Sequence, residues 1–228
     1  KDLMKAVDKC LTEGRMPLVL GGDHSIAIGS VAGSTNFYAR QGESLGLIWF
    51  DAHGDANTPE TTPSGNIHGM SLAVSLGFGD PELVNLGGRA PKVQPRNTVL
   101  IGIRDIDSGE RDFLKKSGVT CYTMRDLDER GMRDVLDEAI RTAGDGTAGI
   151  HLSFDLDVVD PEDAPGTGTP VWGGISYREA HLAMEMFNDR ANIVSLDLVE
   201  VNPVLDSQNM TGILAAELAQ SALGKTIL

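Results

Sequence analysis

Aspartate and histidine side chains gather directly after several apolar runs in the sequence. Residues 21–25 (GGDHS) follow the first such run, and residues 51–55 (DAHGD) follow the second. Three later runs are followed by residues 104–107 (RDID), residues 155–157 (DLD) and Glu200. The strands of an open parallel sheet end on one side, and ligands bind there. We therefore expect these side chains to line one site.

The acidic side chains of this predicted site need a positive partner. Two carboxylates 4 Å apart repel by roughly 4 kcal/mol at an effective dielectric constant of 20. Four would crowd together here, namely Asp51, Asp55, Asp155 and Asp157. At neutral pH a metal cation satisfies them. His24 and His53 add imidazole donors and the motifs contain no thiolate, which favours Mn²⁺ or Mg²⁺ over structural zinc and leaves Fe²⁺ or Co²⁺ as alternatives.

Six donor residues exceed what one ion binds while it keeps an open coordination position. Two ions bridged by shared carboxylates fit the set better, and such pairs lie about 3.5–4 Å apart. Residues 155–160 (DLDVVD) superficially resemble a calcium loop, but they lack its glycine and its distant glutamate. We therefore predict a binuclear site.

The elements that must position these residues alternate between strand-like and helix-like patterns. Strands are predicted for residues 17–20, 45–50, 98–103, 119–123, 149–154 and 193–199. Helical spacing of apolar residues occurs over residues 111–116, 133–142, 178–188 and 212–223. Runs such as LGLIWF and VLIGI are apolar almost throughout, which is typical of strands buried on both faces. The alternation predicts an α/β fold with three αβα layers and a mostly parallel sheet.

Two segments beside the strand ends have further interpretations. Residues 56–67 form a long polar connection, and loops of this length in compact domains are often functional. His68 ends this loop and is a candidate functional residue. Asp23 and Ser25 flank an expected helix start, so helix capping is their expected role. Two other histidines are interpreted as structural or surface residues, namely His151 and His181.

Composition restricts the class of protein. The chain has 228 residues, of which 41% are hydrophobic, as is usual for one globular α/β domain. It carries 19 Lys and Arg against 33 Asp and Glu, a net charge of −14, which argues against nucleic-acid and anionic-membrane partners. No apolar run approaches the roughly 18 residues of a membrane span, and residues 1–10 lack a signal-peptide core. Cys10 and Cys121 are interpreted as reduced thiols of a soluble, cytoplasmic protein.

Six motifs together resemble one family, the ureohydrolases, and within it the arginases. They cover essentially the whole chain, in the family's order and with similar spacing. The motifs are residues 21–25, 51–69 (DAHGDANTPETTPSGNIHG), 104–110 (RDIDSGE), 153–161 (SFDLDVVDP), 167–170 (TGTP) and 199–203 (VEVNP). The resemblance implies an arginase-like catalytic domain over residues 1–228 that hydrolyses L-arginine to L-ornithine and urea.

The resemblance also implies two Mn²⁺ ions per chain and assigns their ligands. One ion would be held by His24, Asp51, Asp55 and Asp155, and the other by Asp51, His53, Asp155 and Asp157. A hydroxide between the ions is the implied nucleophile and adds to the guanidinium carbon. Asp55 would carry a proton towards the leaving amine, and Glu200 would pair with the guanidinium. His68 resembles the family's proton-shuttle histidine.

Recognition of the amino-acid end of the substrate is likewise implied by matching positions. Asn57, Ser64 and, through water, Thr62 match residues that contact the α-carboxylate. Asp107 matches the residue facing the α-ammonium, and Glu110 matches one that reaches it through water. Thr169 lies in the segment beside the guanidinium. Agmatine lacks the carboxylate and would leave these donors unpaired, so arginine is favoured, with agmatine or another guanidino acid as the alternative substrate.

The chain departs from the family pattern at its N-terminus. Family members carry further strand–helix material before the first motif, and only about 20 residues precede it here. We therefore expect an N-terminally truncated domain whose sheet edge lacks its usual neighbour. Family members are trimers or hexamers, and a homo-oligomer of this kind is expected.

Two other classes of protein are compatible with the same motifs. A deacetylase-like amidohydrolase shares the fold but uses one zinc ion, and it would need neither Asp55 nor His24 to complete a second site. A non-catalytic, metal-binding regulatory protein would keep the fold without turnover. Metal content per chain distinguishes the first alternative, with one zinc ion, from an arginase-like site with two manganese ions. A turnover assay distinguishes the second alternative, which has no activity.

Overall fold

A six-stranded parallel sheet is the centre of the computed structural model, which describes residues 1–226. The strand order is β1-β6-β5-β2-β3-β4, and every neighbouring pair is parallel. The strands are β1 (Leu18–Leu20), β2 (Gly46–Phe50), β3 (Thr98–Ile103), β4 (Thr120–Thr123), β5 (Ile150–Asp155) and β6 (Ile193–Val199). All six predicted strands are thus confirmed, and the sheet is wholly rather than mostly parallel.

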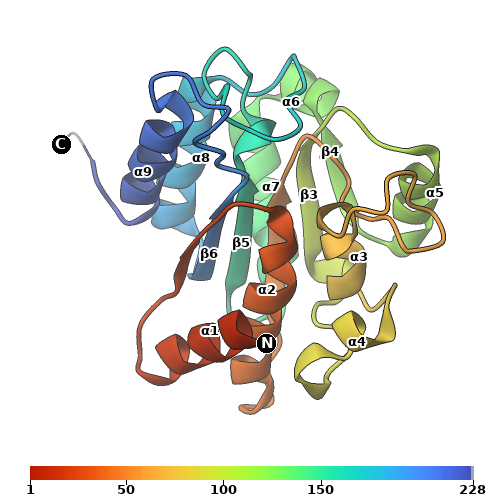
Figure 1. Cartoon of the computed structure of the whole chain (residues 1–228). Coiled ribbons are helices and arrows are strands. Elements are labelled where there is room, and N and C mark those ends of the chain that lie inside the picture. Colours follow the sequence, from red (N-terminus) through yellow and green to blue (C-terminus); the bar gives the residue numbers. More distant parts are fainter. Residues whose placement is uncertain (227–228) are drawn as a thin grey trace.

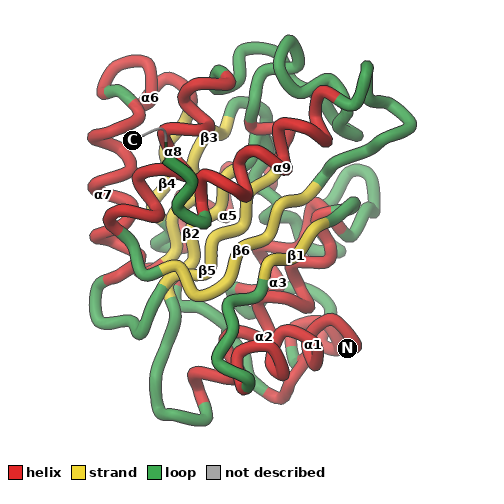
Figure 2. Tube along the Cα trace, turned by 90° about the vertical axis from the view of Figure 1, so that its left-hand side faces the viewer, coloured by secondary structure: helices red, strands yellow, loops and turns green. Residues whose placement is uncertain are grey.

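Helices cover both faces of the sheet. On one face lie α1 (Asp2–Thr12), α2 (Ala27–Ala39), α3 (Ser71–Ser75), α4 (Pro81–Val84) and α5 (Ser108–Ser117). On the other lie α6 (Met124–Arg130), α7 (Met132–Gly144), α8 (Tyr177–Arg190) and α9 (Met210–Ala222). In Figure 1, α2 lies in front of the sheet and α7 behind it. Figure 2 shows the strands side by side between the helices, which confirms the three-layer αβα fold.

Strand β2 shows why these apolar runs become central strands. Its Leu47 and Trp49 pack on the side of α2, whereas Ile48 and Phe50 pack on the side of α7. Successive side chains of a strand point to opposite faces, so a strand covered on both faces must be apolar at every position. All five residues of β2 are buried.

Helix α2 carries no amphipathic pattern, and the sequence therefore predicts a helix start at residues 23–25 but not the range of the helix. Its sequence, AIGSVAGSTNFYA, is rich in small and hydroxyl residues, and its first nine residues are all buried. A Cβ at Gly33 would overlap the backbone of α1 at Met4, so the small residues let α1 pack closely on α2. A helix buried on most sides loses the polar stripe by which periodicity is recognised.

Strand β1 lies at one edge of the sheet and pairs only with β6 among the described strands. Its Leu20 is 68% exposed. Together with α9 and residues 198–203, β1 lines an apolar groove that includes Leu198, Val201 and Ala215. Within residues 1–226, no helix has both the length and the apolar character needed to cross a membrane.

Gly46, the first residue of β2, lies where α7 packs closely on the sheet, and a substitution at this position tests that packing. A Cβ at this position would overlap the carbonyl oxygen of Ala143 in α7. We expect Gly46→Ala to lower the free energy of unfolding by about 1–3 kcal/mol, because backbone atoms must move apart. Gly144→Ala, next to the contacted residue, is the matched control, since its Cβ would meet no atom within 4 Å. Urea unfolding of both variants measures the difference, and equal midpoints would contradict the packing argument.

Candidate metal centre and active-site cleft

The carboxyl ends of the parallel strands converge on one polar cleft. His24 follows β1, residues 51–55 follow β2, Asp155 ends β5 and Glu200 follows β6. Of the predicted site residues, all except the fully buried Asp51 line this cleft. They are His24, His53, Asp55, Asn57, Thr62, Ser64, His68, Asp107, Glu110, Asp155, Asp157, Thr169 and Glu200.

The first group of candidate ligands surrounds His24, which is buried. Its Nδ1 atom lies 3.3 Å from Asp51 Oδ2, 3.3 Å from Asp55 Oδ2 and 3.0 Å from Asp155 Oδ2. Ligand atoms of His24, Asp51 and Asp55 all lie within 4.8 Å of one another, a spacing that one cation can bridge.

The second group surrounds His53. Its Nδ1 atom lies 2.9 Å from Asp157 Oδ2 and 3.4 Å from Asp51 Oδ1. Ligand atoms of Asp51, His53 and Asp157 again fit within 4.8 Å of one another. Asp51 thus belongs to both groups, with a different oxygen facing each histidine, so one carboxylate lies between the two candidate cation positions.

The electrostatics of the cluster fit a cation. Burial and the Asp51 charge raise the pKa of Asp55 well above its ordinary value, and burial and the Asp157 charge do the same for Asp155. Burial opposes the ionisation of Asp51, but hydrogen bonds with His24 and His53 outweigh it and lower the pKa of Asp51. Asp55 Oδ2 is buried without a hydrogen-bond partner. A divalent ion would satisfy this oxygen and offset the repulsion that opposes ionisation.

Two buried residues that the sequence analysis did not identify hold the ligands in position. Trp49 Nε1 donates to Asp51 Oδ2 at 2.9 Å, and the indole stacks on the His24 ring at a centroid distance of 4.1 Å. Ser153 Oγ lies 2.8 Å from His24 Nε2, which leaves Nδ1 facing the carboxylates. Trp49 and Ser153 each precede a strand-end aspartate by two residues, so strand periodicity places them on the same face as Asp51 and Asp155. That spacing is the signal by which both could have been found.

The backbone at two site residues is strained. Asp55 has φ of 47° and Glu200 has φ of 62°, in the left-handed region that side chains other than glycine rarely adopt. Asp55 O accepts hydrogen bonds from the backbone N–H groups of Leu72 and Ala73 at the start of α3. Such conformations cost of order 1–3 kcal/mol each and tend to cluster at functional sites.

The loop expected to bind the substrate is held by the start of α5. Glu110 is buried and accepts from the backbone N–H of Ala56 and of Asp107, each at 3.0 Å. Asn57 Nδ2 donates to Asp107 Oδ2 at 3.0 Å. Glu110 therefore joins the loop to the helix through its two carboxylate oxygens, a role that the sequence analysis did not foresee.

Two hydroxyl groups at the rim of the cleft remain able to donate. Thr62 Oγ1 accepts from the backbone N–H of Gly65 at 3.0 Å, and Ser64 Oγ accepts from that of Asn66 at 3.2 Å. In both contacts the hydroxyl oxygen is the acceptor, so the hydroxyl proton can be donated to another group.

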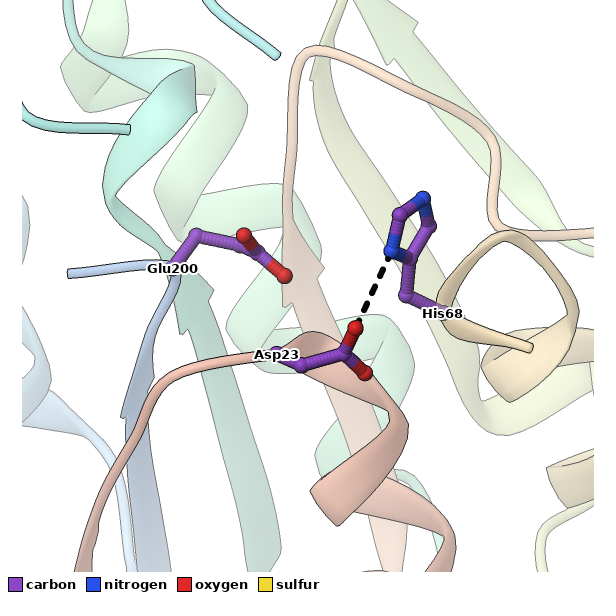
Figure 3. Close-up of side chains that lie close together, drawn as sticks. All are labelled: Asp23, His68 and Glu200. Carbon is purple, nitrogen blue, oxygen red and sulfur yellow. Dashed lines mark hydrogen bonds and ion pairs between the residues drawn. The ribbon is translucent and has the colours of Figure 1, made fainter. Parts of the chain in front are cut away.

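Asp23, His68 and Glu200 lie close together (Figure 3), at the mouth of the cleft that His68 and Glu200 line. His68 Nδ1 lies 3.2 Å from Asp23 Oδ2, and Glu200 Oε1 accepts from the backbone N–H of His24 at 2.6 Å. Asp23 also accepts from Ser25 N–H at 2.9 Å through its other oxygen, which confirms its expected capping role.

The two histidines interpreted as structural lie away from the cleft. His151 is fully buried between α2 and the sheet, where its ring nitrogens contact Asp197 Oδ2 at 3.0 Å and Ser34 Oγ at 2.9 Å. His181 in α8 contacts Ser221 Oγ in α9 at 2.9 Å. Both side chains join neighbouring elements.

The chain is similar to known proteins over nearly its whole length. A family model described as the arginase family matches residues 1–224. A Bacillus subtilis protein named arginase is 57% identical over 226 residues, which make up 99% of this chain and 75% of that protein. The arginase of Bacillus caldovelox is 54% identical over 226 residues, 99% of this chain and 74% of that protein. A crystal structure of Bacillus subtilis arginase matches with a TM-score of 0.94 and 56% identity, over 100% of this chain and 77% of that one.

The shared position of Asp51 leads to a prediction about metal content. Asp51→Asn should lower the amount of bound divalent metal more than Asp157→Asn does, because an amide cannot bridge two cations and both groups of ligands are affected. Emission spectrometry after loading with Mn²⁺ and gel filtration measures the content. Asp105→Asn, an exposed residue near the same strand ends, serves as the control. Equal metal loss in the Asp51 and Asp157 variants would contradict the bridging arrangement.

Proposed function

Because this chain belongs to the arginase family, we propose that it hydrolyses L-arginine to L-ornithine and urea with two Mn²⁺ ions per chain. The observation that carries the proposal is the pair of ligand groups that share Asp51 at the base of a cleft lined with carboxylate, hydroxyl and amide side chains.

The donor set supports manganese and two sites. One ion would be held by His24, Asp51, Asp55 and Asp155, and the other by Asp51, His53, Asp155 and Asp157. Carboxylate oxygens with one imidazole per ion suit Mn²⁺ better than a structural zinc site. When bound, the ions supply activated water for attack on the guanidinium carbon and balance the charge of the carboxylates.

The side chains around the ions orient the guanidinium and move protons. Glu200 offers a carboxylate acceptor to the guanidinium N–H groups, and the backbone N–H of His24 keeps that carboxylate in place. Asp55 carries a proton towards the leaving amine. His68, at the mouth, carries protons between solvent and the cleft.

The outer part of the cleft recognises the amino-acid end of the substrate. Asn57, Ser64 and, through water, Thr62 bind the α-carboxylate, whereas Asp107 faces the α-ammonium. Glu110 reaches the ammonium through water, and it also fixes the loop that carries Asn57. Thr169 Oγ1, 3.3 Å from Asp157 Oδ2, lies beside the guanidinium.

L-Arginine is favoured over agmatine because the cleft provides hydrogen-bond donors that only a carboxylate would use. The hydroxyls of Ser64 and Thr62 accept from backbone groups and keep their own protons available. A substrate without the carboxylate leaves these donors to water. Agmatine and other guanidino compounds remain the alternative substrates.

The setting of the enzyme is part of the same proposal. We place the protein in the cytoplasm as a homo-oligomeric trimer or hexamer, with residues 1–228 forming one catalytic domain. The two cysteines support a reducing compartment, since Cys10 and Cys121 are both free thiols.

Urea release after loading with Mn²⁺ tests the reaction itself. We expect urea and ornithine in equal amounts from L-arginine, and much less urea from agmatine and guanidinobutyrate at the same concentration. Prior treatment with a chelator should abolish the activity, and Mn²⁺ should restore it. A preference for agmatine would replace the proposed substrate, and an absence of turnover on all three compounds would overturn the proposed reaction.

Ser64 tests the recognition of the carboxylate. Ser64→Ala removes one donor to a charged group, which is worth about 1.5–3 kcal/mol, so kcat/KM for L-arginine should fall about 10- to 150-fold. Activity on agmatine should hardly change. Parallel kinetics on both substrates measure the effect, with Ser207→Ala, an exposed serine outside the cleft, as the control. An equal fall on both substrates would assign Ser64 to the support of the loop or the ions.

A further inference from the structure

The carboxylate of Asp23 makes two different contacts, one through each oxygen. Oδ1 accepts from the backbone N–H of Ser25 at 2.9 Å and caps the short turn His24–Ile26. Oδ2 lies 3.2 Å from Nδ1 of His68, a residue 45 positions further along the chain. A capping role explains the first contact only. The second contact joins the turn that carries a candidate metal ligand to the histidine at the mouth of the cleft.

The contact fixes which ring nitrogen of His68 is available to the cleft. In Figure 3 one nitrogen faces Asp23 and the other points away from it. If Nδ1–H donates to the carboxylate, Nε2 of the neutral ring is left without a proton and can accept one. An aspartate that holds a catalytic histidine in one tautomer and orientation is the arrangement used in serine hydrolases.

The energy of this contact points to orientation and not to stability. The His68 side chain is 32% exposed and that of Asp23 is 57% exposed, so water competes with both partners. Ion pairs with this degree of exposure contribute little to folding. Selection among ring tautomers and rotamers needs only a small energy difference, since each 1.4 kcal/mol changes a population ratio tenfold.

Asp23 is itself held in a defined place, which a positioning residue requires. It is followed by His24, whose side chain is buried among the carboxylates and whose backbone N–H donates to Glu200. Gly22 O accepts from the Glu200 N–H at 2.7 Å. The segment from residue 22 to residue 24 therefore connects the base of the cleft, the guanidinium acceptor and His68 through short polar contacts.

We propose that Asp23 is the positioning residue of His68, holding its imidazole as the Nδ1–H tautomer with Nε2 directed to the cleft. This inference rests on the proposed function, in which His68 transfers protons. It concerns the geometry of one side chain, however, so a measurement that needs no turnover can test it separately.

The variant Asp23→Asn separates the two contacts. Asparagine caps helices as well as aspartate does, so the bond to Ser25 can remain while the anionic acceptor for His68 is lost. Asp80→Asn is the matched control, because Asp80 Oδ1 caps α4 through Glu82 N–H at 2.8 Å and Asp80 has no histidine partner among the described contacts.

Kinetics on L-arginine give the first test. Asp23→Asn should lower kcat about 10-fold, a part of the 10²- to 10⁴-fold that a positioned acid–base group contributes, with KM and manganese content unchanged. In a His68→Ala background the same substitution should have no further effect, with or without added imidazole. An equal loss in both backgrounds would show that Asp23 acts through the ions or the fold and would overturn the inference, as would an unchanged kcat.

Nitrogen-15 NMR of the histidine side chains gives the second test and does not depend on activity. The protein is loaded with diamagnetic Mg²⁺ at pH 8, and the His68 signals are assigned by their loss in His68→Ala. The wild type and Asp80→Asn should show a protonated Nδ1 and an unprotonated Nε2, and Asp23→Asn should show a mixture of tautomers. The same His68 spectrum in all three proteins would overturn the inference. If Asp23→Asn changes the His68 spectrum but the wild type releases no urea from L-arginine, the result would count against the proposed function alone.

Discussion

The mutual repulsion of four carboxylates at the ends of β2 and β5 is the constraint on which the rest of the site depends. These residues are Asp51, Asp55, Asp155 and Asp157, all buried. Each needs donors or a cation, because an unpaired charge in the interior is very costly. The surrounding chain supplies backbone N–H groups, the indole of Trp49 and two imidazoles. Asp55 Oδ2 has no hydrogen-bond partner among these groups, and a divalent cation would satisfy it.

Much of this arrangement follows from local features of the sequence. Runs such as GLIWF and VLIGI contain only apolar residues and glycine, which is typical of a short strand covered on both faces. Acidic residues directly after such runs lie at the carboxyl edge of the sheet, because all strands of a parallel sheet end there. Therefore the strands, their parallel arrangement and the convergence of the site could be predicted before any contact was known. The range of helix α2 could not, because burial on most sides removes its amphipathic signal.

The partnerships between side chains depend on tertiary distances that no local pattern contains. Asp23 and His68 meet only because the turn after β1 and the loop after β2 lie next to each other at the cleft mouth. Glu110 directly precedes the predicted helix over residues 111–116, and its contact with Ala56 depends on the path of the loop, which the sequence does not specify. Trp49 is intermediate between these cases, since its period-two spacing from Asp51 is local but its stacking on His24 is not.

The pairing of β1 with β6 affects the order in which the protein folds during its synthesis on the ribosome. Leu18 pairs with Leu196, so the strand that leads to His24 waits for a partner made much later. At about 5–20 residues per second, that delay is roughly ten to forty seconds. During cotranslational folding the strands β2 to β5 can associate first, and α2 can pack on Leu47 and Trp49 of β2 before β6 is made, whereas the pairing of β1 with β6 waits for residues 193–199. The proposed metal ligands all precede residue 158, so they can come together while β6 is still to be made, and the pairing of β1 with β6 extends the sheet afterwards.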